Sequence, residues 1–151
     1  MPGRRVVPEG RRDGFIRNED QPMDEQERRE AGLAMRRRVL GDAYVDKAIE
    51  RTTSLTEDFQ DLVTRYVWAD IWRRPHFDVR TRRILVIGTL IALGRWEELR
   101  LHVSAALAEG KFSQADLREI ALQQAVYCGM PAANTAFTII RELCDAHDDA
   151  R

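Results

Sequence analysis

Glu98 and His102 are the residues of this chain whose types and spacing best suit acid–base chemistry. Two residues four positions apart on a helix lie on the same face, so the carboxylate and the imidazole would be neighbours. An imidazole beside a carboxylate is a common proton donor or acceptor near neutral pH. The alternative is an exposed pair that stabilises a helix by only about 0.3 kcal/mol. Spacing alone favours this surface pair, so a catalytic role needs support from other residues.

The other histidines and Cys128 are weaker candidates for chemistry. His76 follows a proline in a predicted turn, and His147 lies in an acidic C-terminal segment. No metal site is predicted, because Glu98 and His102 would need a third ligand and no other His or Cys is suitably placed. Cys128 has no base near it in the sequence, so we expect a small structural residue rather than a nucleophile.

Aromatic and basic side chains form a second group of candidates. Trp68 and Trp72 share a helical face, and a run of arginines follows them: Arg73, Arg74, Arg80, Arg82 and Arg83. Guanidinium groups beside aromatic walls suit a small planar carboxylate, through paired hydrogen bonds and stacking. The alternative is that the tryptophans are core and the arginines are solvated. We expect most of these arginines at the surface and one or two in contact with a ligand.

The third candidate segment runs from Tyr127 to Asn134. Gly129 and Pro131 predict a tight turn into the N-terminus of a helix, where free backbone N–H groups favour an anion. The small residues after Pro131 would allow a ligand to approach closely.

Helices are predicted to position all of these residues. Capping residues and helical spacing indicate helices over residues 25–40, 42–49, 54–75, 79–93, 96–109, 113–128 and 132–146. The predicted N-terminal caps include Asp42, Ser54, Asp78 and Ser113. No segment alternates apolar and polar residues with β-branched enrichment, so no strand is predicted. The predicted fold class is all-α, a single-domain antiparallel helical bundle of about six to seven helices.

Apolar spacing also predicts which helical faces are buried. On the helix from residue 96, the stripe is Leu99, Val103, Ala106 and Leu107, which leaves Glu98, His102 and Ala105 at its edge. On the helix from residue 54, the stripe with helical spacing is Phe59, Leu62, Val63, Tyr66, Val67 and Ile71.

Composition limits the class of protein. A chain of 151 residues suits one domain with a hydrophobic core. Its net charge of −1 argues against a nucleic-acid-binding protein, which normally has a strongly basic face. The longest apolar run, residues 84–93, is half of the ~20 residues that a membrane helix needs. With two cysteines and no apolar leader at the N-terminus, the chain is expected to be cytoplasmic and without a disulfide scaffold.

Three segments are expected along the chain. Residues 1–24 are rich in Pro, Gly and alternating charge and are predicted to be a disordered tail, with Met23 as an alternative start. Residues 25–146 form the helical domain. Residues 147–151 are predicted to be a frayed C-terminus.

A combination of short motifs spans most of the predicted helical domain. The motifs are Phe59-Gln60, Arg65-Tyr-Val-Trp68, Ile71-Trp72-x-Arg-Pro75, Asp78-x-Arg-Thr-Arg82, Ala92-Leu93-Gly-Arg95, Glu98-Leu-Arg-Leu-His102, Ala105-Ala-Leu107, Gly110 and Tyr127-Cys-Gly-x-Pro-Ala-Ala-Asn134. Each is weak alone, but together they resemble the carboxymuconolactone decarboxylase family, and within it most closely the 4-carboxymuconolactone decarboxylases of protocatechuate catabolism. The resemblance implies an AhpD-like helical fold.

The resemblance also implies a reaction, the decarboxylation of 4-carboxymuconolactone to 3-oxoadipate enol-lactone and CO2 in the β-ketoadipate pathway. The substrate is an unsaturated lactone with a carboxylate and an acetate arm, and it acts as its own electron sink, so no cofactor or metal is expected. Protonated His102, oriented by Glu98, would stabilise or protonate the dienolate. The family further implies a homo-oligomer, a hexamer built as a trimer of dimers.

Binding roles follow from the same resemblance. Arg82 or Arg95 would hold the acetate arm of the lactone. Trp72 or Tyr127 would form an apolar patch for the departing carboxylate, and Asn134 would take part in substrate binding.

Three rival functions remain to be compared. AhpD-like peroxidases carry a Cys-x-x-Cys motif three residues before the matching histidine, and here that stretch reads Arg95-Trp96-Glu97-Glu98, so peroxidase chemistry is disfavoured. A non-catalytic helical assembly or regulatory module would explain the amphipathic helices but not the acid–histidine pair. A related decarboxylase acting on another lactone would differ only in the residues lining its pocket.

Overall fold

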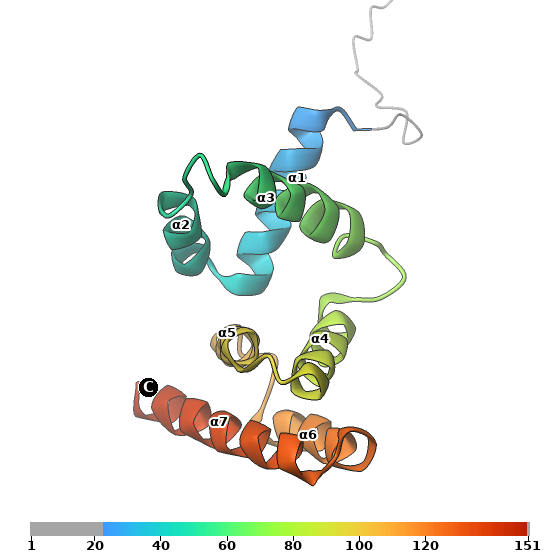
Figure 1. The fold of residues 1–151 in the computed structure, drawn as a ribbon, viewed down its shortest axis with the longest axis vertical. Coiled ribbons are helices and arrows are strands. Elements are labelled where there is room, and N and C mark those ends of the chain that lie inside the picture. The colour runs from blue at the N-terminus through green and yellow to red at the C-terminus, as the bar shows by residue number, and fades with distance from the viewer. Residues whose placement is uncertain (1–22, 151) are drawn as a thin grey trace, which may run out of the picture.

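The structure is a computed structural model that describes residues 23–150, in which every regular element is helical (Figure 1). The elements are α1 (Glu25–Leu40), α2 (Asp42–Glu50), α3 (Glu57–Leu62), the π-helix η1 (Val63–Ile71), α4 (Val79–Leu93), α5 (Trp96–Ala108), α6 (Gln114–Cys128) and α7 (Met130–Asp149). The all-α prediction is confirmed. The predicted tail falls mainly in residues 1–22, outside the described part of the chain.

Several predicted helix boundaries are confirmed by their capping contacts. The Asp78 carboxylate accepts a hydrogen bond from Thr81 N at 2.7 Å and begins α4. Gly94 ends α4 in the left-handed conformation, with φ of 64°. Ser113 and Asp116 form a reciprocal capping box at the start of α6. These local signals place both ends of α4, the helix whose arginines are candidate ligand contacts.

Other boundaries differ from the prediction. Gly41, not Asp42, precedes α2, and the Asp42 carboxylate pairs with Arg37 at 3.2 Å instead of capping the helix. Ser54 does not cap α3, which begins at Glu57 directly after a turn. At the C-terminal end, α7 begins at Met130 and continues to Asp149, three residues beyond the predicted end.

The predicted stripe of the third helix lies on its outer side, because this helix has a second apolar face that packs inward. The C-terminal part of the helix is π-helical, and the backbone N–H of Trp72 donates to Val67 O, five residues earlier, at 3.0 Å. The structure buries Thr64, Trp68, Ala69 and Trp72. The predicted residues are largely on the outside, with Phe59, Tyr66 and Ile71 61%, 52% and 52% exposed.

Two hydrophobic clusters divide the bundle into layers. The larger cluster fills the space among α4, α5, α6 and α7 and includes the predicted stripe residues Leu99, Val103, Ala106 and Leu107, which confirms that stripe. The smaller cluster joins α1, α2 and η1 and contains both Trp68 and Trp72. In Figure 1, α4 and α5 lie between the α1–η1 layer and the α6–α7 layer. The helix that carries His102 is therefore covered on both sides.

Within residues 23–150, no helix combines the length and the apolar character that crossing a membrane requires.

Candidate active site

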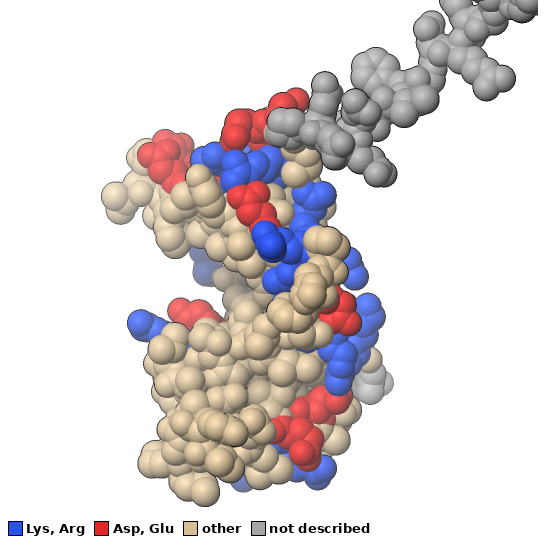
Figure 2. Space-filling view, turned by 90° about the vertical axis from the view of Figure 1, so that its right-hand side faces the viewer, with Lys and Arg blue, Asp and Glu red and all other residues tan. Residues whose placement is uncertain are grey.

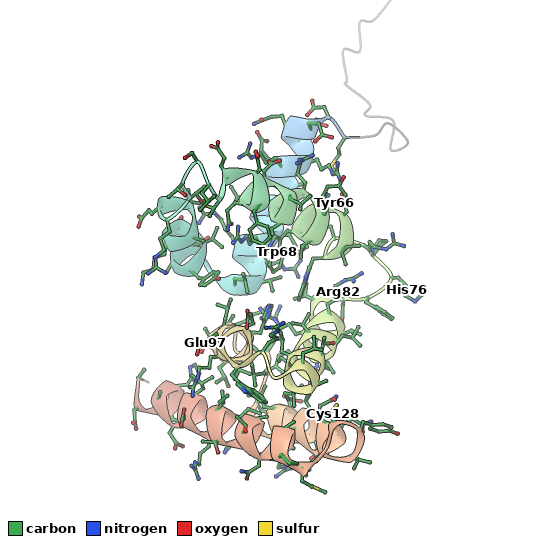
Figure 3. All side chains as sticks on the ribbon, in the orientation of Figure 1. Tyr66, Trp68, His76, Arg82, Glu97 and Cys128 are labelled. Carbon is green, nitrogen blue, oxygen red and sulfur yellow. The ribbon has the colours of Figure 1, made fainter. Side chains whose placement is uncertain are left out.

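His102 lies on the side of α5 that faces η1. Its ring stacks on that of Trp72, with 6.3 Å between the ring centroids and an angle of 11° between the planes. Trp72 in turn contacts Trp68, with the centroids 5.2 Å apart. The three rings form a continuous aromatic wall between the layers, and Figure 3 shows Trp68 on the side of η1 that faces α4 and α5.

The environment of His102 favours a neutral imidazole. Burial, together with the nearby positive charge of Arg83, lowers the pKa of His102 from 6.5 to about 4, although the Glu98 carboxylate acts in the opposite direction. The Nδ1 atom is buried and has no hydrogen-bond partner, and Glu98 is exposed at the surface. The structure therefore corrects the expected protonated His102, because at pH 7 the imidazole of the free protein carries no charge.

Arg83 is the functional candidate that sequence reasoning did not select. Its side chain is 1% exposed, and Nη2 donates to Val39 O at 2.7 Å and to Glu109 Oε2 at 2.8 Å. The sequence run of arginines included Arg83, but the preferred candidates were Arg82 and Arg95. One signal could have identified it: Arg83 lies four and eight residues before Ile87 and Ile91, on the apolar stripe of α4.

Arg82 and Arg95, the two arginines that the sequence favoured, are less enclosed. Arg82 donates from Nη2 to Arg74 O at 3.1 Å and lies over the ring of Phe77, while its Nε is buried without a partner. Figure 3 places Arg82 at the start of α4, close to the connection that carries His76. Arg95 is exposed at the start of α5.

Tyr127 and Asn134 are not brought to His102 within one chain. Tyr127 is 78% exposed in the last turn of α6, and Asn134 borders a surface pocket formed with Arg118 and Phe137. Helices α6 and α7 lie on the other side of α4 and α5 from η1 (Figure 1). In the same region, the thiol of Cys128 donates to Gln124 Oε1 at 2.9 Å, a contact consistent with the predicted structural role.

Several buried nitrogen atoms on η1, α4 and α5 have no hydrogen-bond partner in the structure. They are Trp68 Nε1, Arg83 Nε, Arg83 Nη1 and His102 Nδ1. Buried polar atoms are nearly always hydrogen-bonded, so this group needs a partner such as a polar ligand or water. Figure 2 shows the surface indented between the upper and lower halves of the molecule.

The arrangement suits an anionic organic ligand. A buried guanidinium supplies positive charge, indole and imidazole nitrogens supply further polar contacts, and the aromatic wall supplies an apolar surface. In the part of the chain that the structure describes, no three His, Cys, Asp or Glu side chains gather as metal ligands would.

Known proteins similar to this chain include named decarboxylases. The model of the carboxymuconolactone decarboxylase family matches residues 57–142, which include η1, α4 and α5. The chain is 35% identical over 121 residues to a 4-carboxymuconolactone decarboxylase of Acinetobacter baylyi, covering 80% of this chain and 90% of that protein.

Two further relatives show the range of named activities. A nitrosuccinic acid decarboxylase of Metarhizium robertsii is 35% identical over 125 residues, covering 82% of this chain and 87% of that protein. A 4-carboxymuconolactone decarboxylase of Pseudomonas putida is 44% identical over 48 residues, which cover 32% of this chain and 100% of that sequence. With its helical architecture and these matches along most of its length, the chain belongs to the carboxymuconolactone decarboxylase family.

Proposed function

We propose that this protein is a carboxy-lyase that converts 4-carboxymuconolactone into 3-oxoadipate enol-lactone and CO2. The observation that carries the proposal is the stack of His102 on Trp72 beside the buried Arg83, at the contact of three helices within the family match. Similarity to the Acinetobacter decarboxylase along 80% of the chain supports the choice of substrate.

The substrate itself can accept the electrons of the broken bond. When the bond between the ring carbon and its carboxylate breaks, CO2 leaves and the electron pair delocalises through the ring double bond onto the lactone carbonyl oxygen. A proton then adds to the carbon next to that carbonyl, which gives the enol-lactone. The protein has to stabilise the dienolate and allow this proton transfer, with no external electron sink.

His102 is the residue that we assign to the dienolate. A neutral imidazole can donate its ring N–H to the developing negative oxygen, and one such donor in a water-excluded site is worth about 3 kcal/mol. Glu98 would act through His102, because its carboxylate favours the imidazolium and so assists partial proton transfer. Trp72 would form an apolar wall beside the departing carboxylate, which favours its conversion into neutral CO2.

The other residues predicted to bind the substrate differ in how close they lie to His102 and Trp72. Arg82 has an unpartnered buried Nε and stays a candidate for the acetate arm, the one carboxylate that an arginine can bind without opposing the loss of CO2. Arg95, Tyr127 and Asn134 would reach the same ligand only if a neighbouring copy of the chain supplied them, since they lie at the surface away from Trp72.

We also propose a homo-oligomer, a hexamer built as a trimer of dimers, acting in protocatechuate catabolism in the cytoplasm. Large apolar side chains remain exposed on η1 and on α6, where Val126 and Tyr127 are 76% and 78% exposed. Figure 2 shows a broad uncharged surface over the lower half of the molecule. Contiguous exposed apolar surface is typical of interfaces between subunits.

Nitrosuccinic acid is a second candidate substrate, favoured by the 35% identity to the Metarhizium enzyme. Its nitro group would accept the electron pair as the lactone carbonyl does. Like the lactone, it bears the departing carboxylate on a carbon that also carries an acetate arm. In both reactions the protein has to bind the acetate arm while the neighbouring carboxylate leaves as CO2.

An assay with freshly generated 4-carboxymuconolactone tests the proposal. We expect stoichiometric CO2 and enol-lactone from the parent protein, with unchanged rates after dialysis against a chelator. Nitrosuccinate is assayed in parallel. Turnover of nitrosuccinate alone would replace the first substrate by the second, and turnover of neither would favour a non-catalytic helical module.

A further inference from the structure

Arg83 forms a buried ion pair with Glu109 but leaves two of its hydrogen-bond donors unused, which a purely structural ion pair would not be expected to do. Arg83 has the largest fully buried side chain among the described residues. Of its three guanidinium nitrogens only Nη2 is hydrogen-bonded, while Nε and Nη1 have no partner. Buried ion pairs rarely stabilise a fold unless their remaining hydrogen-bonding groups are also satisfied. A methionine or leucine would fill this position on the apolar stripe of α4 at lower cost.

The charge around Arg83 is also incomplete. Glu109 accepts the hydrogen bond from Arg83, but its other oxygen pairs with Lys111 Nζ at 3.2 Å. One carboxylate thus faces two cations, of which Lys111 is 63% exposed to solvent whereas Arg83 is buried and shares its only counter-ion among the described residues. Burial lowers the pKa of Arg83, and among the described groups Glu109 alone is found to oppose that effect. A bound anion would supply the missing charge and the missing acceptors.

The other unpartnered nitrogen atoms indicate where the anion would be recognised. Trp68 lies in the same aromatic wall as Trp72, and Trp72 stacks on His102. Trp68 Nε1 is a donor that is buried without an acceptor, as are Nε and Nη1 of Arg83. The donors come from η1 and α4: Trp68 contacts Trp72, on which His102 stacks, and Arg83 is near enough to His102 to lower its pKa.

We propose that Arg83, assisted by the indole N–H of Trp68, binds the carboxylate that the substrate keeps, namely its acetate arm. This assignment rests on the proposed decarboxylation, and it names the substrate class as carboxylates that carry an acetate arm beside the reacting carbon. Glu109 is then a positioning residue, because it holds Nη2 and leaves the rest of the guanidinium for the ligand.

The chemistry explains why Arg83 takes the retained carboxylate rather than the departing one. The departing carboxylate becomes neutral CO2, so an arginine bound to it would stabilise the ground state more than the transition state and slow the reaction. The acetate arm keeps its charge throughout. Binding it anchors the substrate without opposing the loss of CO2, and the aromatic wall remains available to the group that leaves.

Succinate is a suitable probe, because it has an acetate arm and no acceptor for decarboxylation. The experiment titrates ¹⁵N-labelled parent protein with succinate and follows the indole N–H resonances of the tryptophans. We expect the Trp68 resonance to shift with saturation. The Arg83→Lys variant, which keeps the charge but loses the planar donors, should bind succinate ~30-fold more weakly or worse and show a similarly raised KM for the lactone.

Arg80→Met is the matched control, since it removes an exposed arginine from the same helix and should leave both constants unchanged. Arg83→Met is added where it folds, and we expect it to abolish succinate binding. The proposal is overturned if succinate leaves the Trp68 resonance unmoved, or if Arg83→Lys binds succinate and lactone as the parent does.

The same data separate this proposal from the proposed function. Lactone turnover with unchanged KM in Arg83→Lys would retain the function and reject the role of Arg83. Succinate binding that depends on Arg83, in a protein that does not turn over the lactone, would retain the anion site and reject the reaction.

Discussion

His102 illustrates how a side chain is adjusted by its surroundings rather than by its sequence neighbour. Glu98 favours the charged imidazole, but burial and Arg83 have the larger combined effect and lower its pKa to about 4. The sequence shows only the first of these influences. The chemistry proposed for His102 would therefore start from a neutral ring in a partly dry site, where one hydrogen bond to a developing oxyanion has its greatest value.

His102→Gln is expected to lower kcat for the lactone by ~10²-fold or more, with a smaller effect on KM, because the contact matures only in the transition state. Steady-state kinetics of the folded variant provide the measurement. His76→Gln is the control, since His76 is exposed on the η1–α4 connection. Parent-like turnover in a folded His102→Gln variant would remove this residue from the site.

The pH dependence of kcat/KM should reflect the lowered pKa of His102. Because this pKa is about 4, the group stays neutral from pH 8 to pH 6, and its acidic limb lies near pH 4. Glu98 raises the pKa of His102, so Glu98→Gln should move that limb to still lower pH while reducing kcat less than His102→Gln does. A limb near pH 6.5 that disappears in His102→Gln would contradict the buried, neutral imidazole.

At the scale of elements, the ion pair between Arg83 and Glu109 connects α4 to the end of α5. Arg100 and Glu142 form a pair of the same length, 2.8 Å, between the exposed surfaces of α5 and α7. Their burial differs strongly. Buried charges that lose their partner are costly, whereas exposed pairs contribute little.

Glu109→Gln should therefore lower the free energy of unfolding by about 3 kcal/mol, and Glu142→Gln by less than about 1 kcal/mol. Chemical denaturation of both variants in the same buffer gives the comparison. Equal losses would show that the buried guanidinium does not depend on Glu109.

The contact between α1 and η1 depends on a glycine. A Cβ at Gly32 would clash with the backbone carbonyl oxygen of Thr64, which cannot move without shifting the π-helix. At Gly88, in the middle of α4, the nearest atom to a Cβ is the flexible end of the Gln124 side chain, at 2.8 Å.

Gly32→Ala should consequently destabilise the protein by about 2 kcal/mol through overpacking, and should lower activity by displacing Trp68 and Trp72. Gly88→Ala should be close to neutral, because the gain in helix propensity offsets the shift of one side chain. Thermal unfolding and lactone turnover are measured together. A neutral Gly32→Ala would mean that α1 and η1 can separate freely.

At the scale of the whole molecule, the outer faces of η1 and α6 carry apolar side chains that one chain does not cover. A hexamer would bury them, and sedimentation of the parent protein at micromolar concentration should reveal it. Val126→Glu, which places a charge on the α6 face, should shift the distribution toward smaller species, whereas Gln26→Glu on exposed α1 should not. A parent protein that sediments as a monodisperse monomer would contradict this proposal.

Much of the architecture follows from local signals in the sequence. Asp78, Gly94 and the Ser113 capping box act within a few residues of themselves, so the ends of α4 and the start of α6 were predictable. The stripe through Leu99 and Val103 was predictable for the same reason, because α5 keeps a regular period. The combination of motifs from Phe59 to Asn134, each weak alone, was sufficient to indicate the family.

Only the tertiary structure decided which side chains share a site. Both faces of η1 carry apolar side chains at helical spacing, and the packing of α1 against η1 decided which of the two faces inward. The burial of Arg83, and the partial exposure of Arg82 beside it, depended on which neighbouring helices cover each face of α4. The charge state of His102 likewise depended on groups distant in sequence, since desolvation and Coulomb interactions act through space and not along the chain.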